Sequence, residues 1–163
     1  MKNKFLSKIN LVIIFFLFTT LAINVVVLKS YRKQLILLED YNNPGQLLWE
    51  LNDLLDFSYE IPNISATSLP IKALISGYYE REGENQKAIS LLKSSIKHNP
   101  FIKFNEYKLA NIYNKLGKYD SAYFYFKDAY DGVPSNILHG SGLLNYLIER
   151  DSFNLAKNHF LDI

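Results

Sequence analysis

The chain has no cysteine among its 163 residues, which excludes disulfide bonds, thiolate metal sites and a cysteine nucleophile. Other signatures of catalysis are missing too. No serine lies in a Gly-x-Ser-x-Gly pattern, and there is no glycine-rich phosphate loop. The three histidines, His98, His139 and His159, share no metal-ligand spacing. We therefore expect no catalytic residue, no cofactor and no metal, and a chain that is not an enzyme.

An excess of charge of one sign is also absent, since the chain carries 18 basic and 16 acidic residues. Lys2, Lys4 and Lys8 precede a long apolar run, so residues 29–163 hold 15 basic residues against 16 acidic ones. A nucleic-acid surface needs a concentrated basic stripe. The composition therefore predicts no nucleic-acid partner.

The apolar run from Ile9 to Leu28 contains 20 residues and no charge. As a helix that rises ~1.5 Å per residue it spans ~30 Å, about one bilayer core. We therefore predict a transmembrane helix or signal anchor at 9–28, behind a basic tail at 1–8. The alternative is a cleaved signal peptide, with a small-x-small pattern at Thr20-Leu21-Ala22. The apolar run continues past that pattern, which favours a retained single-pass anchor.

The charges on either side of this run bear on its orientation. Three lysines and the amino group precede it, while Lys29, Arg32 and Lys33 follow it. Basic flanks tend to stay in the cytoplasm, and long domains cross largely regardless of their charge. The balance leans toward a cytoplasmic N-terminus, with the rest of the chain on the extracytoplasmic side.

Residues 29–68 are predicted to connect the anchor to the C-terminal part. Tyr31 to Tyr41 continues the helix, and Asn42-Asn43-Pro44-Gly45 ends it. Leucines at helical spacing predict a second helix from about Gln46 to Phe57, which would cap the first repeat. The alternative is a helix lying on the membrane surface, but its polar face lacks the basic residues such helices carry. Ser58 to Ser68 is predicted to be an extended loop.

A 34-residue period organises the rest of the chain. Three sets of residues recur at this interval: the turn residues Gly83, Gly117 and Asp151, the small residues Ala88, Ala122 and Ala156, and the prolines Pro100 and Pro134. Such a period, with two helical patterns in each unit, is typical of a helical repeat array. We expect the turn residues to be left-handed and the alanines to be buried where helices cross.

The middle unit resembles the tetratricopeptide repeat. The residues at the positions of that pattern are Ala110, Tyr113, Gly117, Ala122, Phe126, Ala129 and Pro134. The likeness extends over units at 69–102, 103–136 and a truncated 137–163, so it covers residues 69–163. The resemblance implies an all-α solenoid of helical hairpins, here with one N-terminal transmembrane helix. It also implies a non-catalytic module that binds a protein or peptide.

In tetratricopeptide arrays the first helix of each unit lines a concave groove. The positions that match in this chain make five residues candidates for that groove: Tyr107, Asn111, Asn114, Lys115 and Asn145. Asn111 and Asn145 occupy the same position in successive units, where an amide can bond to a peptide main chain. The basic clamp by which some family members hold chaperone C-termini is missing, because Tyr107 and Gly142 occupy its positions. A plain solvated face remains the alternative for these residues.

Two functions are consistent with this pattern. The first is a membrane-anchored scaffold or protein-interaction module of the cell envelope. The second is a tail or accessory fragment of a multi-span polysaccharide enzyme of the O-antigen ligase or polymerase type. The chain also ends without a helix to cover its last hairpin, and terminal repeats need a solvated outer face. We expect Phe160 and Ile163 to form an exposed apolar strip there, with self-association through this C-terminal edge.

Overall fold

The computed structural model describes residues 2–54 and 63–160, with side chains from Asn10 onward. The chain divides into two compact units, residues 1–48 and 49–163. Within the described ranges there are seven α-helices, two short 3-10 turns and one isolated bridge between Ile64 and Pro70. The predicted all-α class is confirmed.

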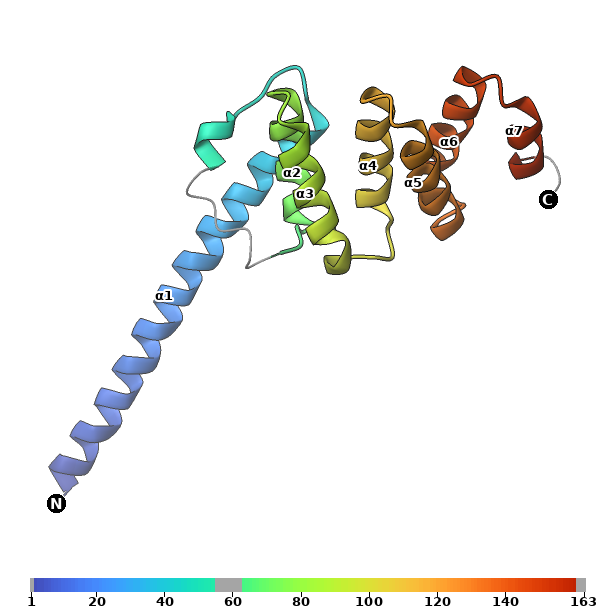
Figure 1. Ribbon diagram of the computed structural model, residues 1–163. Helices are drawn as coiled ribbons and strands as arrows, with labels where there is room; N and C mark the ends of the chain where they lie inside the picture. Colours follow the sequence, from blue (N-terminus) through green and yellow to red (C-terminus); the bar gives the residue numbers. More distant parts are fainter. Residues whose placement is uncertain (1, 55–62, 161–163) are drawn as a thin grey trace. The chain divides into compact units, whose positions relative to one another are not determined.

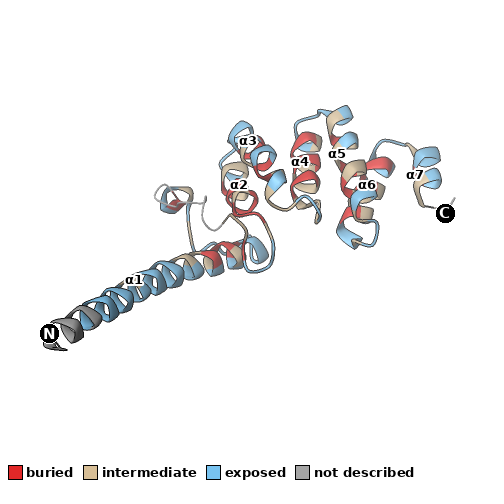
Figure 2. Cartoon of the chain, turned by 90° about the horizontal axis from the view of Figure 1, so that it is seen from below, coloured by how far each residue is buried: buried red, intermediate tan, exposed pale blue. Residues whose placement is uncertain are grey.

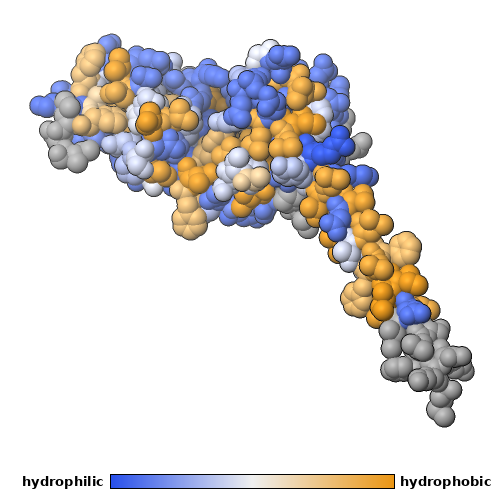
Figure 3. All heavy atoms as spheres, turned by 180° about the vertical axis from the view of Figure 1, so that it is seen from behind, coloured by the Kyte–Doolittle hydropathy of each residue, from blue (hydrophilic) through white to orange (hydrophobic). Residues whose placement is uncertain are grey.

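Helix α1 runs without a break from Lys2 to Asn42. The predicted basic tail, anchor and continuation therefore form one helix, which ends as expected where Asn43, Pro44 and Gly45 begin a turn. It is long and apolar enough to cross a membrane. The apolar side chains from Leu11 to Leu28 are exposed, with Phe18 and Val26 each at 68%, whereas Leu37 near the end of the helix is buried (Figure 2). Figure 3 shows the hydrophobic residues along this helix. A retained anchor and a cleaved signal both fit this observation.

The predicted helix from Gln46 to Phe57 is wrong over its first part. Residues 46–50 are not helical, and a short 3-10 turn η1 (Leu51–Leu54) follows them. The rest of the predicted helix, residues 55–57, lies outside the described ranges. The first part of the predicted loop, residues 58–62, also lies outside them. The cause is two side-chain contacts that compete with helical bonds. The Leu48 N–H donates to Asp40 Oδ1 at 2.7 Å, and the Glu50 N–H donates to Asp53 Oδ2 at 2.8 Å.

In its described residues the C-terminal unit contains six α-helices, which follow one another as three hairpins (Figure 1). They are α2 (Ile71–Arg81), α3 (Asn85–Ser95), α4 (Phe104–Lys115), α5 (Tyr119–Gly132), α6 (Ile137–Glu149) and α7 (Phe153–Phe160), with a 3-10 turn η2 (Ile96–His98) after α3. Each helix packs on the next one along the chain. Contacts therefore run mainly between neighbours in sequence.

The turn inside each hairpin has the same conformation. Gly83 and Gly117 have φ of +76° and +69°, and Asp151 has φ of +52°, so the predicted left-handed turn residues are confirmed. One backbone hydrogen bond recurs across each turn, from the N–H of the residue just before the next helix to a carbonyl of the preceding helix. Its three instances are Glu84 N to Tyr79 O at 2.8 Å, Lys118 N to Tyr113 O at 2.9 Å and Ser152 N to Leu147 O at 2.9 Å.

The alanines at the 34-residue spacing lie in the core, as predicted. Ala88 and Ala122 are fully buried, and Ala156 is 8% exposed. Leucines fill the space beside them, since Leu92 and Leu109 are also fully buried in the same cluster. A small side chain at each crossing lets neighbouring helices approach closely while larger side chains fill the remaining volume.

The expected apolar strip at the C-terminal edge is wrong for Phe160. This side chain is half-buried against the core, and its ring centroid lies 5.0 Å from that of Tyr130 on α5. The Tyr130 hydroxyl also donates to the His159 carbonyl oxygen at 3.4 Å, and both rings lie close to the backbone of α6 at Gly140. Ile163 lies outside the described residues. The exposed apolar side chains at this end are others, among them Phe153 at 61% and Ile148 at 46%.

Candidate functional site

A cavity of about 190 Å³ lies between α4 and α6. It is lined by Tyr107, Asn111, Asn114, Phe126, Ser141, Gly142, Asn145, Tyr146 and Glu149. Four of the five residues predicted for the groove are among these, so the structure brings them together around one space. The fifth, Lys115, lies elsewhere. Amide and hydroxyl groups of α4 and α6 dominate the polar part of the lining.

Asn111 is held in place by its own helix. Its Nδ2 donates to the Tyr107 carbonyl oxygen at 2.8 Å, one turn earlier in α4. This bond fixes the direction of the amide and leaves Oδ1 to accept a hydrogen bond from another group. An asparagine held in this way is prepared to bind without first losing side-chain freedom.

Asn114 contributes an acceptor with no protein partner. Its Oδ1 is buried and has no hydrogen bond within the described chain. A buried polar atom without a partner costs free energy, typically about 1–3 kcal/mol. This oxygen has almost no accessible surface, although the Asn114 residue itself is among those that line the cavity. A bound molecule could therefore reach it only after the side chain turns.

The shape of the cavity depends on Gly142. A Cβ atom at this position would lie 2.6 Å from the ring of Tyr107 and 3.1 Å from that of Phe126, which is too close for any side chain. The Tyr107 ring therefore packs directly on the backbone of α6, edge-on to Phe126 at a centroid distance of 6.1 Å and 5.5 Å from His139. This packing also explains why a basic side chain has no room at position 142.

Lys115 is drawn away from the cavity by a carboxylate on α2. Its Nζ lies 2.5 Å from Glu80 Oε1, while Lys108 Nζ lies 3.9 Å from the other oxygen of the same carboxylate. Burial lowers the pKa of Lys108, and the nearby charge of Glu80 only partly offsets this effect. The predicted groove residue Lys115 thus belongs to an ion cluster between α2 and α4.

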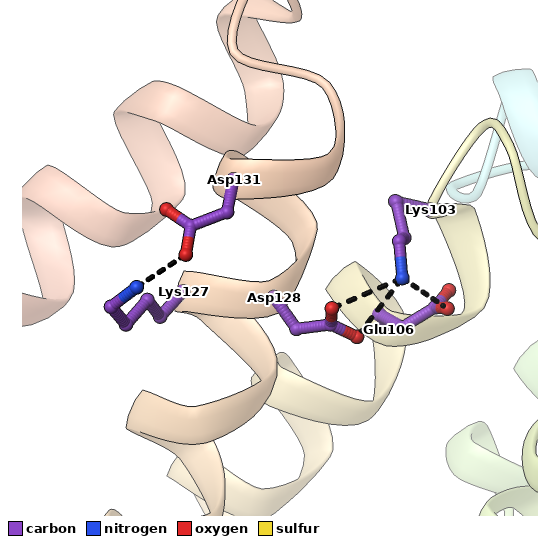
Figure 4. Close-up of polar contacts among 5 residues, drawn as sticks. All are labelled: Lys103, Glu106, Lys127, Asp128 and Asp131. Carbon is purple, nitrogen blue, oxygen red and sulfur yellow. Dashed lines mark hydrogen bonds and ion pairs between the residues drawn. The ribbon is translucent and has the colours of Figure 1, made fainter.

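A second charged cluster joins α4 to α5, and the sequence analysis did not predict it. Lys103 Nζ lies 3.0 Å from Asp128 Oδ1 and 3.3 Å from Glu106 Oε1, as Figure 4 shows. Figure 4 also shows a separate pair on α5, Lys127 with Asp131. Glu106 is almost fully buried, and this burial raises the pKa of its carboxyl above the ordinary value although Lys103 opposes the shift. The cluster is therefore structural, with one carboxylate held in an unfavourable environment.

We expect Glu106→Gln to gain stability relative to the parent chain as the pH rises from below 4.5, the ordinary carboxyl pKa, to neutral. A carboxyl whose pKa is raised in the folded state stabilises the fold fully below the unfolded pKa and loses that contribution as the pH rises through the folded pKa. Glutamine cannot lose a proton. Thermal melting of both proteins across this range, with Glu82→Gln as an exposed control, measures the effect. A stability difference that is constant with pH would contradict it.

The histidines form no metal site in the part of the chain that the structure describes. No group of three or more His, Cys, Asp or Glu side chains is placed to hold a metal ion in those residues. His139 is buried beside Tyr107, and this burial lowers the pKa of its imidazole. His159 lies 3.2 Å from the Tyr123 hydroxyl. Both are packing residues in these contacts.

Five residues that line the cavity are not among the predicted candidates: Phe126, Ser141, Gly142, Tyr146 and Glu149. Phe126 and Tyr146 are mostly buried, with ring centroids 5.4 Å apart, and their helical positions mark them as core residues. One edge of each ring nevertheless reaches the cavity. A pattern that separates core from groove positions cannot find residues that serve both.

Comparison with known proteins adds no support to the tetratricopeptide resemblance, which rests on the residues of the repeats alone. No family model matches the chain, and no curated protein matches it.

Proposed function

We propose that the chain is a membrane-anchored interaction module that binds a peptide segment of a protein partner in the cavity between α4 and α6. Residues 69–163 act as a tetratricopeptide-like array of hairpins in this proposal. The single observation that carries it is the row of amide groups around one cavity, at equivalent positions of successive units. The module itself performs no chemistry.

The lining suits a peptide main chain. A peptide alternates N–H donors and carbonyl acceptors, and an asparagine amide can pair with both at once. Asn111 and Asn145 lie one repeat apart on the two helices that border the cavity, and Ser141 also lines it. Asn114 adds a third amide side chain to the lining. The aromatic ring of Tyr107 supplies apolar surface for a side chain of the peptide.

The membrane attachment proposed here rests on α1. A module that is tethered to a bilayer meets its partners in the plane of the membrane, where their effective concentration is high. This favours a partner that is itself at the membrane. We propose that the module lies on the extracytoplasmic side, because the basic residues that flank the apolar run slightly favour a cytoplasmic N-terminus. A multi-span polysaccharide enzyme of the cell envelope is one such partner class.

The experiment compares what the tagged full-length chain captures from detergent-solubilised membranes with what an Asn111→Ala/Asn145→Ala variant captures. Each lost hydrogen bond weakens binding by about 1 kcal/mol, so loss of two should raise Kd about thirtyfold. We expect a partner that the parent retains through washing to be lost by the variant. Binding of the recovered partner's segments is then measured directly by titration.

The matched control is Asn154→Ala, which removes an exposed asparagine from α7 outside the cavity. It should retain the partner as the parent does. If the double variant and the control capture the same proteins with equal yield, binding does not use the cavity and the proposal fails.

A further inference from the structure

We propose that the peptide bound in the cavity between α4 and α6 carries an acidic group, and that the ion cluster between α2 and α4 binds its carboxylate. This cluster consists of Glu80 on α2 with Lys108 and Lys115 on α4. The carboxylate belongs either to an aspartate or glutamate side chain or to the C-terminus of the peptide. This specificity rests on the proposed function, because the acidic group is part of the peptide that the cavity holds.

The cluster lies next to the cavity along α4. Lys108 and Lys115 are seven residues apart, about two helical turns, so they lie on the same face of the helix. Asn111, which lines the cavity, is three residues after the first lysine and four before the second. Side chains at these spacings are neighbours on a helix surface. A peptide that bonds to Asn111 can therefore extend to both lysines without leaving α4.

The cluster holds more positive than negative charge. Glu80 divides its carboxylate between the two lysines, with Oε1 at 2.5 Å from Lys115 Nζ and Oε2 at 3.9 Å from Lys108 Nζ. Arg81, the next residue of α2, adds a third positive charge that acts on Lys108. One carboxylate thus faces three cations. A second carboxylate, brought by a ligand, would offset part of this excess.

Lys108 is the cation with the weakest partner in the cluster. Its side chain is 16% exposed, and its distance of 3.9 Å to Glu80 is too long for a hydrogen bond. Burial lowers the pKa of Lys108; Glu80 opposes this effect, while Lys115 and Arg81 add to it. A partly buried ammonium group gains from a carboxylate that accepts a hydrogen bond from it. A ligand carboxylate can supply what Glu80 does not.

Helix α2 leaves space beside this ammonium group because residue 77 is glycine. Apart from adjacent residues and the backbone of α2 itself, the described chain brings only Lys108 Nζ within 4 Å of the position a Cβ would take at Gly77, at a distance of 3.8 Å. No side chain of residue 77 therefore fills the space next to Nζ. A group as small as a carboxylate can approach Lys108 from this side.

The test uses the full-length chain in detergent micelles and an immobilised library of random octapeptides. Sequencing of the captured peptides should show enrichment of aspartate or glutamate, or a requirement for a free C-terminus. One captured peptide is then titrated in three forms: unchanged, with its acidic side chains replaced by their amides, and with an amidated C-terminus. The form that lacks the bound carboxylate should bind the parent chain about tenfold or more weakly, which identifies its source.

Two substitutions in the cluster should change this acid preference in opposite directions. Lys108→Met removes the cation but keeps a long apolar stem, so it should bind the acid and amide forms of the peptide equally. Glu80→Gln removes the competing carboxylate and should strengthen binding of the acid form about twofold to fivefold. A general loss of structure would weaken both variants, and circular dichroism checks their helical content. If Lys108→Met does not fold, Glu80→Gln alone decides.

The outcomes separate this specificity from peptide binding itself. Captured peptides that show no acid preference, but are lost by Asn111→Ala/Asn145→Ala, overturn the acidic specificity and leave the proposed function standing. An acid preference that Lys108→Met retains, or a folded Glu80→Gln variant that binds the acid form no more tightly than the parent, also overturns it. If the parent captures no peptide, both proposals fail.

Discussion

Phe126→Ala is expected to lower the free energy of unfolding by about 3–5 kcal/mol, because a large ring leaves the centre of the core. The side chain is 3% exposed and lies between two other rings, with centroids 6.1 Å away at Tyr107 and 5.4 Å away at Tyr146. Those contacts join α5 to the helices before and after it. The loss should therefore loosen the second and third hairpins together. Chemical unfolding of the full chain in detergent micelles, followed by circular dichroism, measures the change.

The same helix provides the control for this substitution. Phe124 lies two residues away and is 62% exposed, so Phe124→Ala should change stability by no more than about 0.5 kcal/mol. The two variants remove the same chemical group from the same helix and differ only in burial. Equal destabilisation by both would mean that α5 is turned differently against its neighbours.

Leu17→Arg combined with Leu21→Arg is expected to release the chain from membranes. Each arginine near the centre of a span costs about 2.5–3.5 kcal/mol for insertion, so the pair opposes it by about 5–7 kcal/mol. Both leucines are exposed along α1, at 63% and 61%, where lipid would contact them. The parent chain should sediment with membranes after an alkaline wash, and the variant should appear in the soluble fraction.

Tyr31→Arg combined with Leu35→Arg is the matched control, since these residues have the same spacing on α1 but lie beyond the predicted span. It should sediment like the parent. Intact mass of the mature parent chain separates an anchor from a signal: a retained anchor keeps Ile9 to Leu28. Loss of this segment from the mature mass would contradict the prediction.

The features that the sequence predicted well depend on single residues and their immediate neighbours. A glycine followed by a new helix predicts a left-handed turn at Gly83 and Gly117, and the 34-residue spacing extends the same conformation to Asp151. Alanine among large apolar residues predicts a close crossing at Ala88 and Ala122. Local chemistry and a fixed period are enough for these inferences.

The features that the sequence missed depend on contacts between distant residues. The leucines before residue 51 have helical spacing, but the Asp40 carboxylate takes the Leu48 N–H from eight residues away and no helix forms there. Lys115 has a groove position, yet Glu80, on a different helix, binds its ammonium group. Periodicity assigns a residue to a face of its helix and cannot say which side chain it meets.

The candidate site contains features that the sequence predicts and features that depend on contacts between distant residues. The repeat places Asn111 and Asn145 at equivalent positions, and they do line one cavity. The Tyr107 ring packs against the backbone at Gly142, and this close contact depends on how α4 and α6 approach each other. The sequence therefore predicts the polar lining, and packing determines the shape.

Because each helix of the C-terminal unit packs mainly on the next one along the chain, few long loops must close before native contacts form. Chains whose contacts are local in sequence fold quickly, and segments fold as they emerge during synthesis. A hairpin of this unit can thus become compact before the following one has left the ribosome or crossed a bilayer. No disulfide is needed to complete it, since the chain has no cysteine. The order of synthesis and the order of assembly can coincide, from the α2–α3 hairpin to α7.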